Sequence, residues 1–348
     1  MANILIATGI FPPQIGGPAQ YAKEVRDAFR ADGHHVTVLT YELERKLPPL
    51  VRHALFFMRT LVRLPGVDFI LALDTFSVGW PAVMAATLLG KKIVIRTGGD
   101  FLWESYVERT GDKVLLRKFY ATRMARLSAK ERFIFGVTRN TLRRASAVIF
   151  STTWQRDMWL SAYDLDLNKC FIVENFYGEK MSASASASGD GDSAPTVSAA
   201  PKIFVAGTRP LVLKNLPRLS EAFSSAQQTN SQIFLDTRPV PNEQFLKKIS
   251  SAYAVILVSL ADISPNMILE AIRAGKPFIL TRENGLMNRI ADIGIFCDPE
   301  NTESITEKIL WLADEKNYLE QKRKVEAFNF LHSWEEIARE ILAVATKT

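Results

Sequence analysis

The stretch from Tyr253 to Arg282 constrains the fold more than any other part of the sequence. An apolar run at 253–258 (YAVILV) predicts a buried strand, and a second apolar run follows at 278–281. Between them, Ser264 is a candidate helix N-cap, and Pro265 fits the first helical position, where a missing N–H costs nothing. The pattern predicts a helix over 266–273 that Gly275 closes. This order of elements predicts a βαβ unit whose helix starts at the carboxyl edge of a parallel sheet.

The start of this helix has the properties of an anion site. Its first N–H groups have no partner within the helix and carry a partial positive charge, which suits a phosphate. Ser264, Asn266 and Met267 are therefore candidate ligand contacts at this edge. Two carboxylates bracket the helix start, Asp262 in the loop and Glu270 in the helix. Acids are also favoured there by the helix dipole alone, so a purely structural role stays open for both.

The rest of the chain repeats the alternation of strand and helix. We predict further strands at 3–8, 35–40, 68–73, 92–96, 147–151, 169–174, 202–206, 232–236 and 294–297. Helices are predicted from the glycine-rich loop at 9–21 to about residue 31, and at 47–63, 77–89, 302–314 and 316–329, with an amphipathic tail from Ser333. Such alternation predicts parallel sheets with helices on both faces.

Length and composition indicate a soluble protein with two domains. The chain has 348 residues, of which 47% are hydrophobic and 23% charged. It contains no uncharged apolar run long enough to span a membrane, and MANILIATGIFPP predicts a first strand rather than a signal peptide. The two cysteines, Cys170 and Cys297, are predicted to be buried thiols in a reducing compartment. We therefore expect a cytoplasmic protein. The four histidines show no metal-ligand spacing.

The residues at 262–277 resemble the nucleotide-sugar site of the retaining glycosyltransferases of family four, which have the GT-B fold. The family signature is an acidic residue, seven others, then Glu-Ala, a short helix and Gly-x-Pro. Here it corresponds to Asp262, Glu270, Ala271, Gly275 and Pro277, with Asp where Glu is usual. The resemblance implies that Glu270 holds the ribose hydroxyls of the donor and that Asp262 contacts the donor sugar.

Three more loops carry the resemblance. In GTRPLVLKN (207–215), Arg209 and Lys214 match the family's cations that neutralise the donor diphosphate, with Asn215 as the expected N-cap of the next helix. Gly16 and Gly17 precede a helix, and the resemblance implies that they face the same diphosphate. Asp100, in TGGDFLWE (97–104), follows a strand where many members carry a His near the transferred sugar. It is a candidate contact for the donor sugar or the acceptor hydroxyl, or alternatively an N-cap.

The resemblance implies a GT-B fold with two Rossmann-like domains that face each other across a cleft. We expect a first, acceptor-side domain at 1–178, a flexible low-complexity linker at 179–201, a nucleotide-sugar domain at 202–330, and a C-terminal helix at 331–348 that crosses back to the first domain. The segment 181–200 (MSASASASGDGDSAPTVSAA) holds no large side chain after Met181, which is the basis of the linker prediction.

The expected function is retaining transfer of a sugar from a nucleoside diphosphate sugar to a lipid-linked or glycan acceptor, as in the synthesis of cell-envelope glycans. The resemblance implies no metal and no cofactor besides the donor. Two alternatives stay open: a sugar-nucleotide epimerase of the same fold, and a catalytically inactive nucleotide-sugar-binding protein.

Positive charge is concentrated in the first half of the chain. Residues 1–180 hold 25 Lys and Arg against 17 Asp and Glu, and the remainder holds 18 against 20. The stretch 113–144 predicts two amphipathic helices with ten cations and only Glu131 as an acid, and 47–63 carries three arginines. These faces are either simply solvated or bind an anionic partner, such as the inner surface of a membrane or a phosphate-bearing acceptor. No nucleic-acid-binding motif accompanies the charge.

Overall fold

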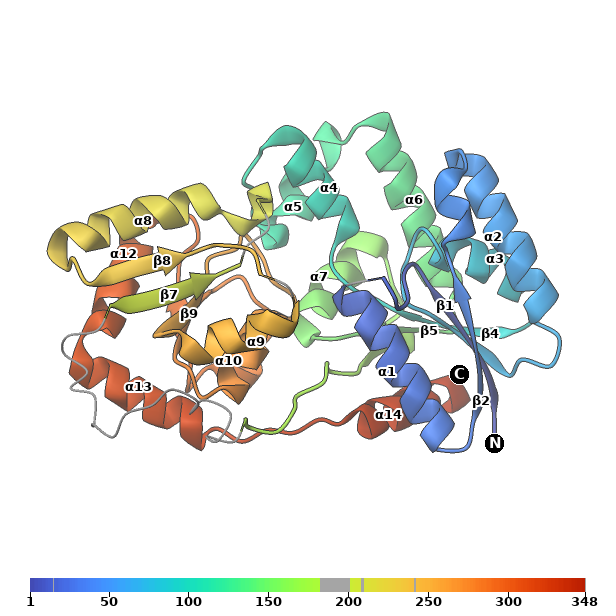
Figure 1. Ribbon diagram of the computed structural model, residues 1–348. Helices are drawn as coiled ribbons and strands as arrows, with labels where there is room; N and C mark the ends of the chain where they lie inside the picture. Colours follow the sequence, from blue (N-terminus) through green and yellow to red (C-terminus); the bar gives the residue numbers. More distant parts are fainter. Residues whose placement is uncertain (15, 182–200, 208–209, 241, 348) are drawn as a thin grey trace. The chain divides into compact units, whose positions relative to one another are not determined.

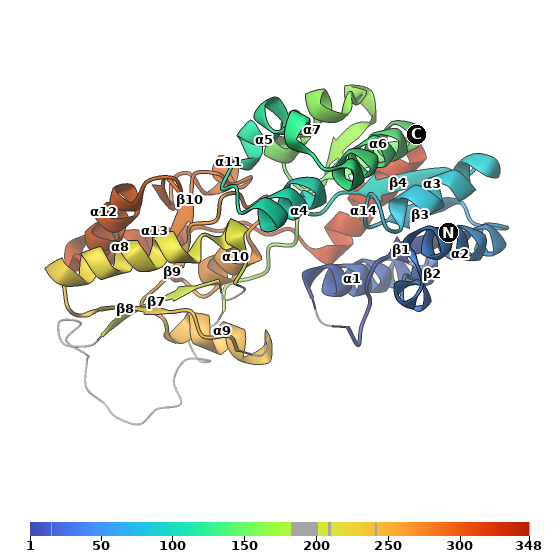
Figure 2. The same ribbon diagram turned by 90° about the horizontal axis from the view of Figure 1, so that it is seen from above.

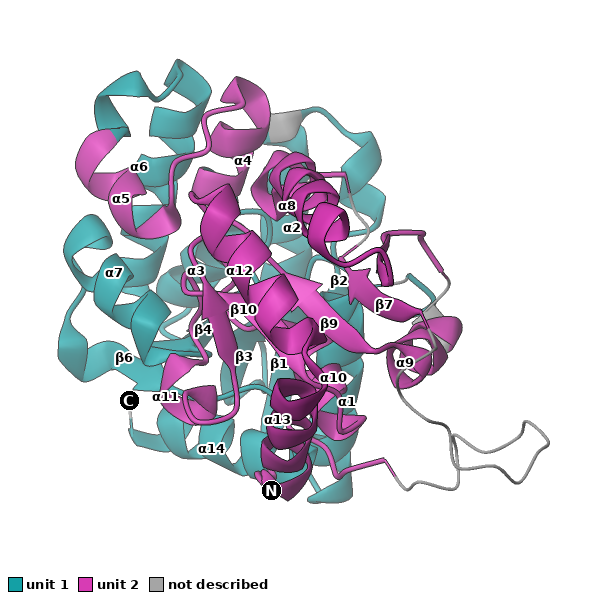
Figure 3. Ribbon diagram, turned by 90° about the vertical axis from the view of Figure 1, so that its left-hand side faces the viewer, with its two compact units in different colours: residues 1–102, 123–176, 332–348 teal, residues 103–122, 177–331 magenta. Residues whose placement is uncertain are grey.

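The computed structural model describes residues 1–14, 16–181, 201–207, 210–240 and 242–347. It divides into two compact units, coloured separately in Figure 3. Unit 1 contains Met1–Leu102, Arg123–Phe176 and His332–Thr348, and unit 2 contains Trp103–Thr122 and Tyr177–Leu331. The contacts therefore group residues 103–122 with the second unit, whereas the sequence prediction assigned 1–178 to one domain. Most of the predicted linker lies outside the described residues.

Unit 1 is built on a parallel sheet of six strands. Its strands are β1 (Asn3–Thr8), β2 (His35–Thr40), β3 (Phe69–Ala72), β4 (Lys92–Arg96), β5 (Ala147–Phe150) and β6 (Cys170–Ile172). They lie in the order β2-β1-β3-β4-β5-β6, and every neighbouring pair is parallel. The four inner strands, β1, β3, β4 and β5, carry buried apolar runs because helices cover both faces of the sheet, as Figure 1 shows.

Unit 2 contains a parallel sheet of five strands. Its strands are β7 (Lys202–Ala206), β8 (Ile233–Asp236), β9 (Ala254–Leu257), β10 (Phe278–Thr281) and β11 (Ile295–Cys297), arranged as β11-β10-β9-β7-β8. All pairs are again parallel. The predicted α/β class with parallel sheets is confirmed.

Most helices lie between successive strands in the chain, and α12, α13 and α14 follow the last strand. Those of unit 1 are α1 (Gly17–Ala31), α2 (Pro49–Arg63), α3 (Gly79–Leu88), α6 (Ala129–Arg144), α7 (Thr153–Tyr163) and α14 (Trp334–Lys347). Those of unit 2 are α5 (Leu116–Thr122), α8 (Leu216–Thr229), α9 (Asn242–Ser251), α10 (Asn266–Arg273), α11 (Met287–Ile290), α12 (Thr302–Ala313) and α13 (Glu315–Ala327), together with most of α4 (Phe101–Thr110). Figure 2 shows the same elements from above.

Two basic stretches of unit 1 and unit 2 contain the predicted helices, with 3₁₀ turns beside them. The helix expected at 47–63 is α2, which begins at Pro49, a position in the first turn where proline is tolerated, and a 3₁₀ turn, η1 (Leu43–Lys46), precedes it. In the stretch 113–144, α5 and α6 are separated by a 3₁₀ turn, η2 (Met124–Arg126). Ser128 starts α6 by a reciprocal capping box with Glu131, which accounts for the only acid in that stretch.

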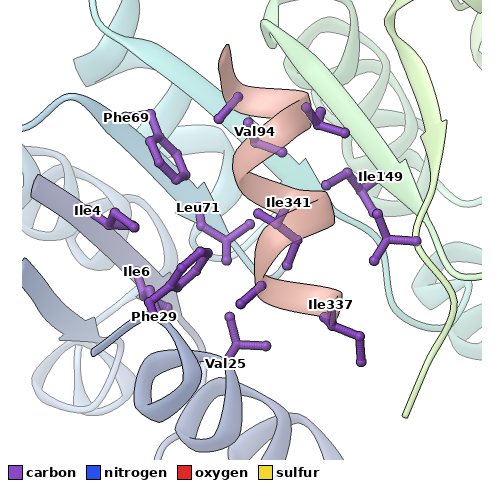
Figure 4. Close-up of a cluster of buried hydrophobic side chains, with 14 of the residues drawn as sticks. Ile4, Ile6, Val25, Phe29, Phe69, Leu71, Val94, Ile149, Ile337 and Ile341 are labelled. Carbon is purple, nitrogen blue, oxygen red and sulfur yellow. The ribbon is translucent and has the colours of Figure 1, made fainter. Parts of the chain in front are cut away.

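The last helix completes the core of unit 1. Ile337 and Ile341 of α14 are fully buried, and Figure 4 shows them beside Val25 of α1 and apolar side chains of the sheet. Trp334 at the start of α14 lies edge-on to Tyr21, with ring centroids 5.4 Å apart. The predicted return of the C-terminal helix to the first sheet is confirmed. No helix in the described part of the chain is long and apolar enough to cross a membrane.

Candidate functional site

The sheet of unit 2 has a topological switch point between β7 and β9. The helices that follow these two neighbouring strands cover opposite faces of the sheet. Leu219 and Phe223 of α8 pack with Phe204 and Ile256 on one face. On the other face, Ile268 and Ile272 of α10 pack with Val255 and Leu257. The loops at the carboxyl ends of the two strands therefore diverge and leave a crevice, which is where open α/β sheets bind ligands.

An ion pair between Lys214 and Asp262 lies at this switch point. The Nζ atom of Lys214, on the loop after β7, is 3.0 Å from Oδ2 of Asp262, on the loop after β9. Lys214 Nζ is also 3.4 Å from the hydroxyl of Ser259. The two charged side chains are 18% and 16% exposed, so the pair is largely shielded but accessible from the edge of the sheet. The structure thus brings together two residues that the sequence analysis selected separately.

The backbone around Lys214 is fixed by residues that the sequence analysis did not select. Lys214 ends the 3₁₀ turn η5 (Val212–Lys214), and the Glu108 carboxylate of α4 accepts from both backbone N–H groups that open this turn, each at 3.1 Å. No local pattern could have identified Glu108, because its partners are more than 100 residues away in the chain. Arg209, the second predicted cation of this loop, lies outside the described residues.

Asn215 directs the chain into α8 by a mechanism other than the predicted one. It does occupy the N-cap position, but its side chain makes no capping hydrogen bond. Its backbone is left-handed (φ 57°), a conformation that asparagine tolerates better than most residues. The side-chain amide instead donates to the carbonyls of Val258 (3.3 Å) and Pro299 (2.9 Å), which ties the loop after β7 to the end of β9.

The Asp262 loop is held by the segment that follows β10. The N–H of Asp262 donates to the carbonyl of Glu283 (2.8 Å), and the N–H of Gly285 donates back to the carbonyl of Asp262 (3.1 Å). Asn284 is buried beside it and donates from its amide to the carbonyl of Thr281. These bonds fix the backbone at Asp262, so that its carboxylate is presented to Lys214 in one orientation.

Glu283 is a second buried acid next to this loop. Its side chain is 3% exposed, and one carboxylate oxygen is 2.9 Å from Nε of Arg117 on α5. Burial raises the pKa of Glu283, and the Arg117 guanidinium offsets that rise only in part. The sequence analysis missed Glu283, since an acid directly after a strand has no feature that separates it from an ordinary loop acid.

The helix α10 begins one residue later than a Ser264 cap would require. Pro265 is the N-cap, because its carbonyl accepts the first helical bonds, from Ile268 (3.0 Å) and Leu269 (3.2 Å). The predicted Ser264 N-cap is therefore wrong, and Ser264 lies in the preceding loop. Proline cannot cap with its side chain, so the N-cap residue itself makes no side-chain hydrogen bond to the helix start at Asn266 and Met267. The predicted end is confirmed: Gly275 follows the helix with φ 64°.

Glu270 lies on α10 and forms an ion pair with Arg273. One oxygen of its carboxylate is 2.9 Å from the Arg273 guanidinium, and both side chains are 28% exposed. Within the described part of the chain, the other oxygen accepts no hydrogen bond. Partial burial raises the pKa of Glu270, and Arg273 acts in the opposite direction with a smaller effect. The residue can thus offer one acceptor oxygen to a hydroxyl ligand while Arg273 fixes the other.

The candidate residues of unit 1 are described separately. Gly16 is the N-cap of α1 with φ 152°, a conformation open only to glycine, and a Cβ there would lie 3.3 Å from Ile10. Gly17 is the first residue of the helix, whereas the sequence predicted that both glycines precede it. Asp100 is 1% exposed and accepts a hydrogen bond from the Trp159 indole at 2.8 Å. This contact gives Asp100 a structural role in unit 1, and we do not carry it into the proposed site.

The described residues include no group of three or more His, Cys, Asp or Glu side chains placed to hold a metal ion. What the unit 2 edge provides is a lysine with a carboxylate partner, a helix start whose N-cap is a proline, and a half-buried glutamate. A cation and free N–H groups can bind phosphate oxygens, and carboxylates can accept from sugar hydroxyls.

The fold is similar to that of several solved enzymes. No protein-family model and no curated protein matches the sequence. Sucrose-phosphate synthase from Thermosynechococcus elongatus aligns over 100% of this chain and 99% of its own, with a TM-score of 0.70 and 14% identity. WaaG, a glycosyltransferase involved in lipopolysaccharide biosynthesis, aligns over 99% and 100%, with a TM-score of 0.67 and 13% identity. UDP-GlcNAc 2-epimerase from Methanocaldococcus jannaschii aligns over 99% and 100%, with a TM-score of 0.54 and 12% identity.

These comparisons define the architecture. The chain has the GT-B fold of these glycosyltransferases, with two Rossmann-like sheets, as the sequence predicted. Transferases and an epimerase share this fold, so the reaction has to be argued from the side chains of the site.

Proposed function

We propose that the protein is a retaining glycosyltransferase that transfers a sugar from a nucleoside diphosphate sugar to a lipid-linked or glycan acceptor. The observation that carries the proposal is the convergence of Lys214 and Asp262 at the switch point between β7 and β9, with Glu270 on the helix that follows. Positive charge, N–H donors and carboxylates at one edge suit the diphosphate and the hydroxyls of such a donor.

Each residue has a separate proposed role. Lys214 binds the diphosphate, whose negative charge grows as the glycosidic bond breaks, so its contribution is largest in the transition state. Asp262 accepts from a hydroxyl of the donor sugar, and its pairing with Lys214 keeps the two groups in register before the donor arrives. Glu270 accepts from the ribose hydroxyls, and the start of α10 contributes N–H donors at Asn266 and Met267. We propose no protein nucleophile and no metal.

The acceptor is proposed to be a lipid-linked or glycan molecule used in cell-envelope glycan synthesis, with the protein at the inner face of the membrane. Support comes from the basic first half of the chain and from the fold likeness to WaaG, whose name refers to lipopolysaccharide biosynthesis. An anionic membrane surface attracts such a protein to the place where a lipid-linked acceptor resides.

The test begins with the donor. A thermal-shift screen over uridine, guanosine, adenosine and thymidine diphosphates and their sugars should single out one nucleotide. A true ligand at about 100 times its Kd stabilises the folded protein by about 2.7 kcal/mol. Donor consumption is then followed with pooled glycan and lipid-linked acceptors. If no nucleotide diphosphate shifts the melting temperature and no donor is consumed, the proposal is wrong.

The epimerase alternative is supported by the fold likeness to a UDP-GlcNAc 2-epimerase. Epimerisation requires groups that remove and return a proton at carbon, and the described part of unit 2 has no histidine. Incubation with the sugar nucleotide and no acceptor separates the two reactions, because only an epimerase would convert the donor to its epimer. An inactive binding protein would instead bind nucleotide without consuming donor under any condition.

A further inference from the structure

The outward face of α2 is apolar, although the helix already has an apolar inward face. Phe56 and Thr60 point into unit 1 and are fully buried. On the other side, Leu50 is 72% exposed, Met58 54% and Val62 74%. These three positions are separated by multiples of four residues, so they form one stripe along the helix. A surface helix is normally polar on the side that faces water, so the apolar outward face of α2 is unusual for a helix exposed to solvent.

The apolar surface continues onto α3, which packs beside α2 (Figures 1 and 2). Met84 and Leu88 lie one turn apart on α3 and are both exposed, and Leu89 follows them. We call the exposed set the α2–α3 face: it consists of Leu50, Val51, Met58, Val62, Met84 and Leu88. Eight of the seventeen exposed large apolar side chains of the described chain lie within residues 43–89, so the exposure is concentrated there.

Aromatic contacts join this region to α6. The ring of His53, on α2, lies 5.0 Å from that of Trp80, on α3. The Trp80 ring in turn lies 6.0 Å from that of Phe133, on α6, and Phe133 is 49% exposed. The three helices therefore share one aromatic cluster, and its outer member adds to the exposed apolar surface.

Charge in the surrounding helices has one sign. The stretches 43–67, 79–99 and 123–144 contain only two acids, Glu44 and Glu131, and both are buried. Glu44 is paired with Arg59, and Glu131 caps α6. Exposed cations accompany the apolar residues: they are Arg45, Lys46, Arg63, Lys130 and Arg132. The exposed acids Glu42 and Asp68 directly flank the first stretch, so the cations are in excess around the face.

We propose that the α2–α3 face is a membrane-docking surface that inserts its apolar side chains into the interfacial region of an anionic bilayer. Exposed apolar side chains flanked by an excess of cations match the chemistry of such a surface on both counts. A second copy of the chain fits less well, because its own face would bring the same positive charge. The inference deepens the proposed membrane location and does not depend on the transfer reaction.

The ion pairs in the structure indicate which cations are available to bind an anionic membrane. The sequence analysis assigned the stretch 113–144 as a whole to a cationic face. In unit 2, however, Arg117 pairs with Glu283 and Lys118 with Glu300. In unit 1, Arg139 and Arg143 share Asp164. Among the residues that the structure describes, Arg59 beside the α2–α3 face pairs with Glu44, and the exposed cations Arg45, Lys46, Arg63, Lys130 and Arg132 form no ion pair with an acid.

The test is flotation of the full chain with vesicles of phosphatidylcholine, with and without phosphatidylglycerol. The parent protein should float with the phosphatidylglycerol vesicles, and rising salt should weaken this binding. A triple variant (Leu50→Ser, Met58→Ser and Val62→Ser) should bind these vesicles at least about tenfold more weakly, which corresponds to about 1.4 kcal/mol. The matched control carries Leu167→Ser, Leu319→Ser and Leu331→Ser, exposed apolar residues outside the face, and should bind like the parent.

Several outcomes would overturn the proposal. These are absence of parent binding to either vesicle, equal loss in the control variant, and a concentration-dependent dimer that the triple variant dissociates without any vesicle binding. Because every substituted side chain of the face is exposed, melting temperatures should match the parent. Nucleotide binding measured without lipid reports on unit 2 alone, so failure of the docking surface and failure of the donor site are distinguished.

Discussion

The Nζ atom of Lys214 lies 3.0 Å from Oδ2 of Asp262, across a loop pair separated by 48 positions in the sequence. A lysine that is paired before the donor arrives is held in place by its own site. A donor diphosphate then has to share this cation with Asp262 or take it over. We therefore expect replacement of Lys214 and replacement of Asp262 to change donor affinity and turnover in different ways.

Replacing Lys214 by Ala should impair turnover more than donor affinity. Loss of one preorganised contact to developing charge costs on the order of 3 kcal/mol, or about a hundredfold in rate. Titration calorimetry with the nucleoside diphosphate, beside donor turnover, measures both effects. Lys316→Ala removes an exposed cation elsewhere in unit 2 and should change neither. Equal affinity and turnover in Lys214→Ala and the parent would exclude this lysine from the site.

Replacing Asp262 by Ala should impair use of the sugar donor without weakening nucleotide affinity. It releases Lys214 from its partner, so nucleoside diphosphate affinity should stay the same or increase. Use of the sugar donor should fall, because the proposed contact with the sugar is lost. The two ligands are compared by calorimetry on the same protein sample. A parallel loss of affinity for both would indicate that Asp262 acts only by supporting its loop.

Glu270→Ala should weaken nucleotide affinity and have little effect on the rate of transfer once the donor is bound. Ribose hydroxyls do not change during transfer, so a contact to them stabilises ground and transition states alike. A hydrogen bond to a charged group contributes about 1.5–3 kcal/mol, so affinity should fall about tenfold or more. Glu307→Ala, an exposed acid on α12, is the control. Tight nucleotide binding by Glu270→Ala would refute the assignment of this helix to the ribose.

Nucleotide affinity should also depend on pH through Glu270. Burial raises the pKa of this carboxyl above its ordinary value of 4.5, with Arg273 opposing the shift. Protonation therefore begins at a higher pH than in an ordinary glutamate, and affinity should fall as the pH is lowered through the raised pKa. Glu270→Gln is always neutral and should lose this part of the dependence. The nucleotide's own titration is common to both proteins, so identical profiles would contradict the prediction.

Glu108 should act as a positioning residue. Its carboxylate accepts two N–H bonds that open the turn carrying Lys214. Glu108→Ala leaves both donors without this partner and should displace Lys214, so turnover falls while Lys214→Ala adds little further loss. Glu108→Gln retains one acceptor oxygen and should restore part of the activity. Additive effects of Glu108→Ala and Lys214→Ala in the double variant would show that the two residues act independently.

The strands were predictable because their signal is local and strong. Asn3–Thr8, Lys202–Ala206 and Phe278–Thr281 have the predicted bounds, since strands covered on both faces are read as continuous apolar runs. The helix at 266–273 was bounded correctly for a similar reason, with proline before it and glycine after it. The Ser264 cap failed because a serine beside a proline has two possible places at a helix start.

The support of the site was not predictable, because it depends on contacts between distant parts of the chain. Sequence patterns selected Lys214 and Asp262 but could not pair them. The Glu108 carboxylate accepts from backbone N–H groups, and the Glu283 carboxylate pairs with Arg117. Partners of this kind leave no periodic pattern in the sequence. The membership of residues 103–122 in unit 2 follows from the same contacts, which only the folded chain reveals.

The position of α14 has a consequence for synthesis on the ribosome. Its buried isoleucines complete a core whose other members come from α1 and from strands β1 to β5, yet this helix is translated after all of unit 2. Domains generally fold as they emerge, N-terminal first. We therefore expect the nascent first sheet to keep the apolar surface that α14 covers open to solvent until this helix leaves the exit tunnel. During that interval the protein is most dependent on chaperones, and a stalled or truncated chain would be an aggregation-prone product.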